Sequence, residues 1–176
     1  KVDSYLATLK VTTKAGINIK VPLYARTVVA DPGNAVLYDG KTQMKSGTVA
    51  EMLAENTSAY ANPIIKLSGD YSDAVAINKN ITFDLNGYTL SNTLTVSGGN
   101  VTIAYGPYGG TISSNVSVTG GKLILTGGTI TGNVNVSAGA TLEQNGAAIT
   151  GDVTNAGTMT TTDGSITGQL ASSGVL

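Results

Sequence analysis

The sequence predicts an all-β fold, a single-stranded parallel β-helix, and three observations support this prediction. First, 23 of the 176 residues are glycine and only 12% are charged, whereas roughly 25% are charged in a typical domain. Second, Thr, Ser and Asn replace the missing charge, which is typical of extended chain and tight turns. Third, the C-terminal half repeats with a period of roughly 18 residues. This period is too short for helical repeats of about 33 residues and fits one coil of three short strands.

The repeat is clearest in three consecutive blocks, 115–132, 133–151 and 152–168. Each block opens with Asn or Asp followed by Val, and each closes on Ile-Thr-Gly. Short runs of alternating apolar and polar residues lie between Gly-rich corners, as expected for strands with one face inward. Looser copies precede them at 76–92 and 93–114, the second lengthened by a loop at AYGPY. We therefore expect about five coils.

The residues that open the blocks recur at nearly equal intervals along the chain: Asn115, Asn133, Asp152 and Gln169. Because equivalent corners of a β-helix stack, Asn115, Asn133 and Asp152 are predicted to form an internal structural ladder of hydrogen bonds. A ligand-binding row at the same positions is the alternative.

Two interpretations exist for the hand of the winding. Six apolar residues lie six apart from Ile112 to Leu142, which is the hexapeptide spacing of left-handed β-helices. The series then ends, because Ala148 and Thr154 follow, and the coils differ in length. We therefore favour an irregular right-handed solenoid.

The segment INKNITFDLNGYTLSNTLTVSGGNVTI, residues 77–103, resembles the rungs of pectin-lyase-like right-handed β-helices in secreted and cell-surface proteins of Gram-positive gut bacteria. The resemblance covers roughly 64–170 and is absent over 1–40. It implies a secreted or cell-surface module of a larger protein. The N-terminal KVDSYLATLK is not a signal peptide, so an exported protein would contain this chain as a mature part or fragment.

A short N-terminal β-hairpin and a capping helix are expected to form a domain over 1–60, ahead of a β-helix over 61–176. Residues 4–29 alternate in polarity around a Lys14-Ala15-Gly16 turn, which predicts the hairpin.

The capping helix is predicted over about 49–57. Thr48 and Glu51 fit a capping box, and an apolar stripe follows. We expect this helix to cover the open apolar end of the first coil. The last coil has no equivalent cover in the sequence, which indicates either truncation or end-to-end self-association through the uncapped C-terminal coil.

The composition argues against several classes of function. There are no cysteines and no histidines, which excludes disulfides and removes the commonest general base. Net charge is −1 with a single arginine and no basic run, so no nucleic acid partner is expected. No run of about 18 apolar residues exists, so no membrane span is expected.

The resemblance makes a polysaccharide lyase or hydrolase worth testing, and the residues argue against it. Such enzymes need an Arg or Lys base with bound Ca²⁺, or clustered carboxylates. After Asp84 the only acids are Glu143, Asp152 and Asp163. Since each is separated from the next by about half a coil, they are not expected to share a face. We predict that the chain is not an enzyme.

Two candidate ligand sites remain. Asp70, Asp73 and Asp84 could meet in neighbouring coils and hold Ca²⁺ through oxygen ligands; ordinary solvated acids are the alternative, and no other cofactor is expected. A second candidate consists of the aromatic rings around the AYGPY loop: Tyr88, Tyr105 and Tyr108. Side chains that cover apolar surface are the alternative for these three.

The function predicted from the sequence is a non-catalytic structural or adhesin-like interaction scaffold whose partners are glycans or surface proteins of host or bacterium. The alternative is a carbohydrate-binding module that uses Tyr88, Tyr105 and Tyr108.

Overall fold

Two structural units make up the chain, residues 1–32 and 33–176. The computed structural model describes residues 4–12, 18–25 and 33–176. The boundary expected near residue 60 lies inside the second unit, because the capping elements belong with the coils.

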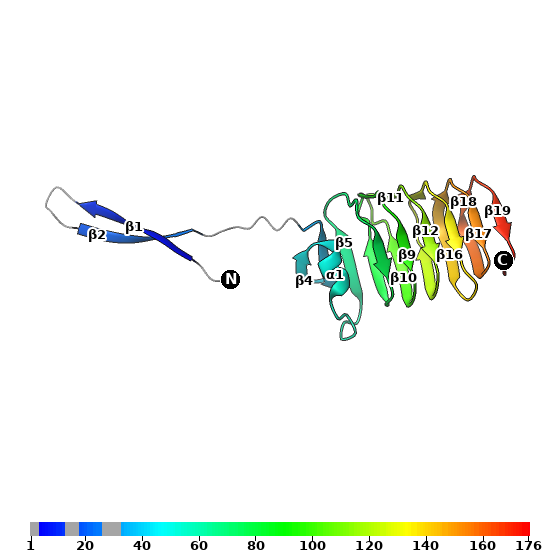
Figure 1. The fold of residues 1–176 in the computed structure, drawn as a ribbon, viewed down its shortest axis with the longest axis horizontal. Coiled ribbons are helices and arrows are strands. Elements are labelled where there is room, and N and C mark those ends of the chain that lie inside the picture. The colour runs from blue at the N-terminus through cyan, green and yellow to red at the C-terminus, as the bar shows by residue number, and fades with distance from the viewer. Residues whose placement is uncertain (1–3, 13–17, 26–32) are drawn as a thin grey trace. The chain divides into compact units, whose positions relative to one another are not determined.

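The first unit contains an antiparallel hairpin of β1 (Ser4–Thr12) and β2 (Asn18–Ala25) (Figure 1). This confirms the two strands expected there. The expected turn at 14–16 lies outside the described residues.

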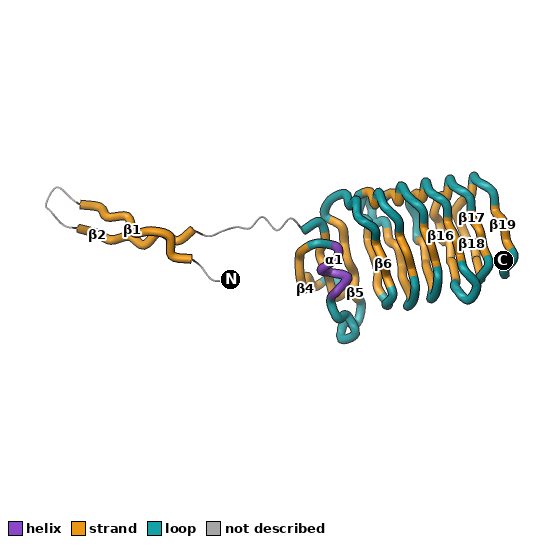
Figure 2. Tube along the Cα trace, in the orientation of Figure 1, coloured by secondary structure: helices purple, strands orange, loops and turns teal. Residues whose placement is uncertain are grey.

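The second unit is a parallel β-helix, as the sequence predicts, in which six coils stack along the unit (Figures 1 and 2). Three faces line it, here called A, B and C; faces A and B belong to one sheet and face C to another. Face A contains β5 (Pro63–Leu67), β7 (Ile81–Asp84), β10 (Asn100–Ala104), β13 (Lys122–Leu125) and the first halves of β16 (Thr141–Ile149) and β18 (Thr158–Ile166). Face B contains β8 (Thr89–Leu90), β11 (Thr111–Ile112), β14 (Thr129–Ile130) and the second halves of β16 and β18. Face C contains β6 (Val75–Ile77), β9 (Leu94–Val96), β12 (Val116–Val118), β15 (Val134–Val136), β17 (Val153–Asn155) and β19 (Leu170–Ser172).

The sixth coil is the first in the chain, β5 with β6, and the sequence repeat, whose first copy starts at residue 76, did not include its β5 part. Tyr71 stands in for its face B strand through a parallel bridge to Leu90.

The coils differ in length, and the parallel register shows where. One outward column of face A runs through Ile64, Thr82, Thr102, Ile124, Glu143 and Thr160. The step from Thr102 to Ile124 is the longest along the chain, and it contains the AYGPY loop. Strand pairing therefore tolerates extra residues when they lie at corners.

Inward and outward positions alternate along the strands of the coils from β5 to β17, apart from the corner within β16, as period-2 patterning requires. In β18 and β19 of the last coil most positions are exposed. In β13, Leu123 and Leu125 are fully buried, whereas Ile124 faces outward and is half-buried. Ile124 belongs to the series of apolar residues six apart, so the hexapeptide pattern does not describe an inward row. The hand of the winding stays a prediction.

The cap comprises a hairpin of β3 (Ala35–Asp39) and β4 (Thr42–Gly47) followed by α1 (Val49–Ala54). β3 continues face A by pairing antiparallel with β5, and α1 packs on β3, β4 and β5. Val49 and Met52 of α1 are fully buried in the same core as the coils. The predicted cap of the apolar end is thus confirmed, although β3 and β4 were not predicted.

The capping box is present: Glu51 N–H donates to Thr48 Oγ1 (3.2 Å) and Thr48 N–H donates to Glu51 Oε2 (2.9 Å). The helix ends at Ala54, earlier than the expected residue 57. Glu55 is already extended (ψ 141°), and the Asn56 side chain accepts from Ser58 N–H (3.1 Å). Such a local side-chain turn competes with continued helix.

Candidate functional site

The three tyrosines predicted as a binding platform do not share one surface. Tyr105 is buried, with 4% of its surface exposed, whereas Tyr108 is 78% exposed. Tyr88 is half-buried and packs against the core. Tyr105 lies over Gly127 and Gly128 of the next coil, so its ring fills a corner and is not available to a ligand.

The Tyr105 hydroxyl is buried and has no hydrogen-bond partner among the described residues. Burial also raises the pKa of this phenol far above its usual value. A buried polar group without a partner usually costs about 1–3 kcal/mol.

We therefore expect Tyr105→Phe to stabilise the protein by about 1 kcal/mol, since the ring keeps its packing and the unpaired hydroxyl disappears. In the unfolded chain the Tyr105 phenol has the ordinary tyrosine pKa of about 10, whereas burial raises its pKa in the folded state. The free energy of unfolding of the wild type is therefore unaffected by ionisation of this group below pH 10 and falls as the pH rises above that value. The advantage of Tyr105→Phe should accordingly grow above pH 10. Urea denaturation at several pH values measures both effects, with Tyr88→Phe as the control; a destabilised Tyr105→Phe would show that the hydroxyl has a partner.

The three aspartates considered for Ca²⁺ each lie beside a different protein group: Asp70 and Asp84 accept hydrogen bonds, and Asp73 lies near the Tyr71 phenol. Asp70 Oδ1 accepts from Thr89 N–H (2.8 Å), and Asp84 Oδ1 accepts from Asn86 N–H (2.9 Å). Asp84 also pairs with Lys66 at 3.6 Å. The Tyr71 pKa is raised, mainly by burial and secondly by the charge of Asp73. Within the described part of the chain, no three acidic side chains gather in one place.

Asn115, Asn133 and Asp152 lie in one column at the start of face C. Asn115 Oδ1 accepts from Asn133 N–H (2.9 Å), and Asn133 Oδ1 accepts from Asp152 N–H (2.9 Å). Asp152 Oδ1 continues the series by accepting from Gln169 N–H (2.8 Å). The bonds run from backbone N–H groups to side-chain oxygens instead of between side-chain amides. The three side chains are exposed, so the ladder lies on the surface of the stack and is not internal as predicted.

Removing one member of this column should cost about 1 kcal/mol, the usual net value of a hydrogen bond. Asn115→Ala leaves Asn133 N–H without its acceptor. Asn115→Asp keeps an oxygen in place and is the matched control, expected within about 0.5 kcal/mol of wild type. Chemical denaturation measures both changes, and equal stabilities for the two variants would contradict a structural role for the column.

Two buried amides join the last coils, and neither was predicted from the sequence. Gln144 donates to Ala147 O (2.7 Å) and Ser165 O (3.0 Å) and accepts from Thr161 Oγ1 (3.3 Å). Asn155 donates to Ser172 Oγ (3.1 Å) and Val175 O (2.9 Å). Both side chains are fully buried, so their polar groups are used inside the stack.

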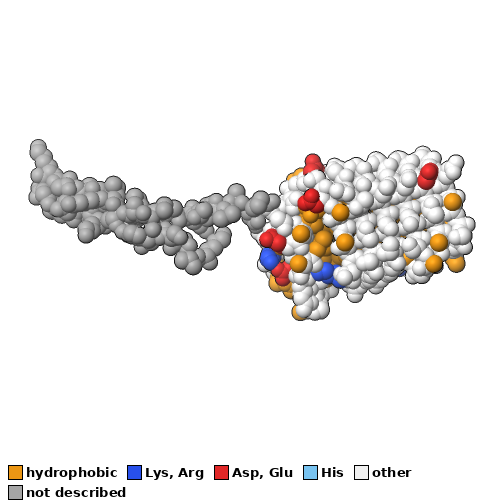
Figure 3. Space-filling model, viewed as in Figure 1, with side chains coloured by type: hydrophobic (Ala, Val, Ile, Leu, Met, Phe, Trp, Pro, Cys, Tyr) orange, Lys and Arg blue, Asp and Glu red, His pale blue; other side chains and the backbone are white. Residues whose placement is uncertain are grey.

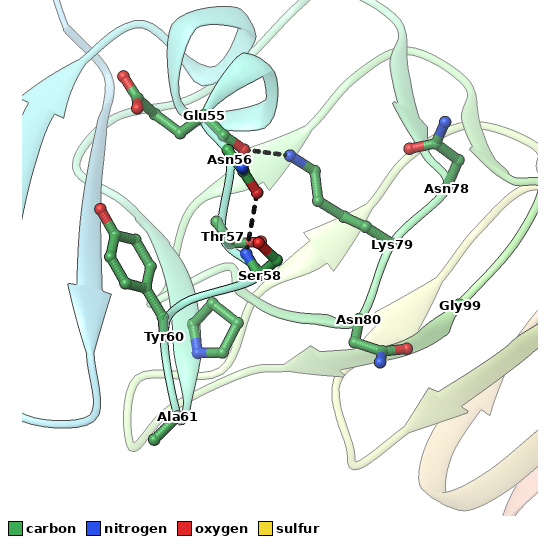
Figure 4. Close-up of a pocket in the computed structure, with 11 residues that line it drawn as sticks. Glu55, Asn56, Thr57, Ser58, Tyr60, Ala61, Asn78, Lys79, Asn80 and Gly99 are labelled. Atoms are coloured by element: carbon green, nitrogen blue, oxygen red, sulfur yellow. Dashed lines mark hydrogen bonds between the residues drawn. The ribbon is translucent and has the colours of Figure 1, made fainter.

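A pocket of about 610 Å³ lies where the cap meets the first coils (Figure 4). One wall is the loop after α1, and the other is the corner between β6 and β7, with Gly99 of the next coil beside it. The residues that line it are Glu55, Asn56, Thr57, Ser58, Tyr60, Ala61, Pro63, Asn78, Lys79, Asn80 and Gly99. Neither this pocket nor Tyr60 was singled out from the sequence; the polar runs ENTSAYANP and NKN were the available signals.

Lys79 holds the two walls together (Figure 4). Its Nζ donates to Leu53 O in the last turn of α1 and to Glu55 O (2.7 Å) directly after the helix, where a positive charge also favours the helix dipole. Thr57 O accepts from Tyr60 N–H (3.0 Å) inside the loop. The pocket is therefore preformed by bonds that a ligand does not have to supply.

Most charged side chains of the second unit lie near this end. On the face drawn in Figure 3, acidic, basic and hydrophobic side chains gather beside the cap, and the sides of the later coils are mainly neutral. After Asp84 the chain has only four charged residues: Lys122, Glu143, Asp152 and Asp163. Charged side chains are thus concentrated at the cap end of the coils.

No helix in the described part of the chain is long and apolar enough to cross a membrane. Comparison of the chain with known protein families, with characterised proteins and with solved structures found no match.

Proposed function

We propose that this chain is a non-catalytic β-helix module that acts as a structural or adhesin-like interaction scaffold of a larger bacterial protein. The observation that carries the proposal is the use of polar side chains to bond one coil to the next. The column from Asn115 to Asp152 and the buried Gln144 and Asn155 all bind neighbouring coils. Such bonds stiffen a solenoid, in which each coil contacts mainly its neighbours.

The acidic side chains of the later coils already have protein partners, which supports the proposal that the module is not catalytic. Glu143 pairs with Lys122, and Asp163 Oδ1 accepts from Gly164 N–H (2.8 Å). A hydrolase needs two carboxyl groups on either side of one scissile bond. Incubation with plant and host polysaccharides, followed by assays for reducing ends and unsaturated uronates, tests this; product above a heat-inactivated control would overturn the non-catalytic proposal.

A secreted or cell-surface location and a pectin-lyase-like ancestry belong to the proposal through the resemblance of residues 77–103 to such rungs. Antibody labelling of intact cells that express the full gene product tests the location. Labelling that requires permeabilised cells would contradict it.

If the module is a rigid scaffold, the distance between two residues along face C should have a narrow distribution. Ala76 and Ala171 stand at the two ends of an outward column of six residues, five coil steps apart. At about 4.8 Å per step, their Cα atoms should lie about 24 Å apart. Because the chain has no native cysteine, Ala76→Cys/Ala171→Cys can be spin-labelled and measured by pulsed electron resonance. A broad distribution would rule out a rigid spacer.

Carbohydrate binding near the AYGPY loop is the second candidate, and the exposure of Tyr108 favours it. The burial of Tyr105 reduces the proposed surface to Tyr88 and Tyr108.

End-to-end self-association is a further expectation, since Leu170, Val175 and Leu176 of the last coil are exposed. Sedimentation of wild type and Leu170→Ser tests the association, and a monomer at all concentrations would contradict it.

A further inference from the structure

The pocket between the cap and the first coils offers neutral polar groups around an aromatic ring. Its volume of about 610 Å³ lies within the range of about 300–1,000 Å³ that small-molecule sites occupy. Tyr60 lines it, half-buried against the core, and Ala61 and Pro63 add apolar surface. Asn56, Asn78 and Asn80 are exposed around it.

The charged groups of the pocket already have protein partners. Lys79 Nζ donates to two backbone carbonyls, and Glu55 pairs with Lys45. The wall thus holds one positive and one negative side chain, whose charges offset each other. A ligand would meet little net charge there, which favours a neutral molecule over a phosphate or a carboxylate.

The amides, by contrast, keep free hydrogen-bonding capacity. Asn80 Oδ1 accepts from Asn100 N–H (2.8 Å) and Asn56 Oδ1 accepts from Ser58 N–H. These bonds fix both side chains and leave their NH₂ donors without a partner among the described residues. The Asn78 side chain makes no hydrogen bond within that same part of the structure, so it offers both a donor and an acceptor.

We propose that this pocket binds a neutral saccharide. Amide side chains that can donate and accept suit vicinal hydroxyl groups, which also do both. The Tyr60 ring supplies an apolar face with a polar edge, against which the C–H side of a sugar ring can pack. The loop and corner are already held by Lys79, so binding does not have to order them.

A second hollow extends the site for a longer chain. It has a volume of about 480 Å³ and shares Ala61, Pro63 and Asn80 with the first pocket. From there it follows face A past Thr82 and Thr102. Two adjoining hollows suit an oligosaccharide better than a single sugar, so a disaccharide or longer ligand should bind more tightly than its monosaccharide.

The test uses the full chain labelled with ¹⁵N and a panel of neutral disaccharides: cellobiose, maltose, lactose, mannobiose and chitobiose. Digalacturonate is the acidic comparison. We expect at least one neutral member to shift the side-chain amide signal of Asn78 in a saturable way. No saturable shift with any neutral sugar up to about 20 mM, well above the Kd of a weak specific site, would overturn the proposal, as would preferred binding of digalacturonate.

Matched variants locate the binding. Tyr60→Ala should weaken it about tenfold and Asn78→Ala about fivefold, whereas Asn135→Ala, which changes an exposed asparagine on face C, should leave Kd unchanged. Tyr108→Ala distinguishes this pocket from the candidate surface at the AYGPY loop. Circular dichroism melts check that each variant is folded. Loss of binding in Tyr108→Ala alone would move the site to the AYGPY loop and overturn this assignment. The inference rests on the interaction role proposed above; a narrow spin-label distance without saccharide binding would refute only the pocket.

Discussion

Gly128→Ala should destabilise the protein by about 3 kcal/mol, although it adds a single methyl group. Gly128 has φ +69°, a conformation that costs non-glycine residues about 1–2 kcal/mol. A Cβ atom there would also overlap the ring of Tyr105, and such overpacking adds about 1–3 kcal/mol. The ring has nowhere to move, because it fills a corner between stacked coils.

Gly139→Ala separates the two causes. Gly139 has a similar φ of +80°, but a Cβ there would meet no atom within 4 Å, so only the backbone cost of about 1–2 kcal/mol should remain. The second check is a double-mutant cycle: in a Tyr105→Ala background, Gly128→Ala should cost no more than Gly139→Ala. Urea denaturation measures all variants. Equal losses for Gly128→Ala and Gly139→Ala in the wild-type background would show that the ring does not constrain this corner.

This glycine shows which interpretation of the AYGPY tyrosines holds for Tyr105. A loop that interrupts a regular coil usually marks an exposed and functional segment, which made a binding platform one interpretation, and rings that cover apolar surface were the other. In the structure Tyr105 occupies the next inward position after Ile103, where the following coil has Gly127. The complementarity between a large ring in one coil and glycines in the next is visible only once the register is known.

The repeat, in contrast, was predictable, because strand alternation and corner residues are local properties. Val116 and Val118 are inward, and Asn115 and Asn133 bond across coils as their spacing suggested. The hairpin before α1 was also within reach, since Asp39-Gly40 is a turn signal between alternating runs. Rows of stacked residues whose coils differ in length could not be predicted, because their members recur at irregular intervals along the chain. One such row on face B stacks Thr89, Thr111 and Thr129.

The pocket could not be predicted from the sequence, and the reason is physical. Its walls are Asn56 to Pro63 on one side and Asn78 to Asn80 on the other, and Lys79 joins them through backbone carbonyls. A lysine that bonds to carbonyls leaves no pattern in the sequence, since any residue supplies a carbonyl. Only the position of the cap on the first coil brings these segments together.

Phe83→Ala should cost about 3–5 kcal/mol, the usual range for truncating a buried aromatic side chain. Phe83 is the only phenylalanine and is fully buried. Its register partners are Ile65 toward the cap and Ile103 in the next coil. Because the parallel ladder fixes the spacing of these strands, the coils cannot close on the cavity, and the loss should lie near the top of the range.

The neighbouring Thr82→Ala is the control, since Thr82 is half-buried on the outward side of the same strand and should change stability by no more than about 0.5 kcal/mol. In a solenoid each coil contacts mainly its neighbours, so damage at Phe83 should fall most heavily on the coils beside it. Hydrogen exchange tests this: amides of β5, β7 and β10 should lose more protection than those of β17. Uniform loss across all coils would show instead that the cap and the six coils unfold as one cooperative unit, in which Phe83 supports the last coil as much as the first.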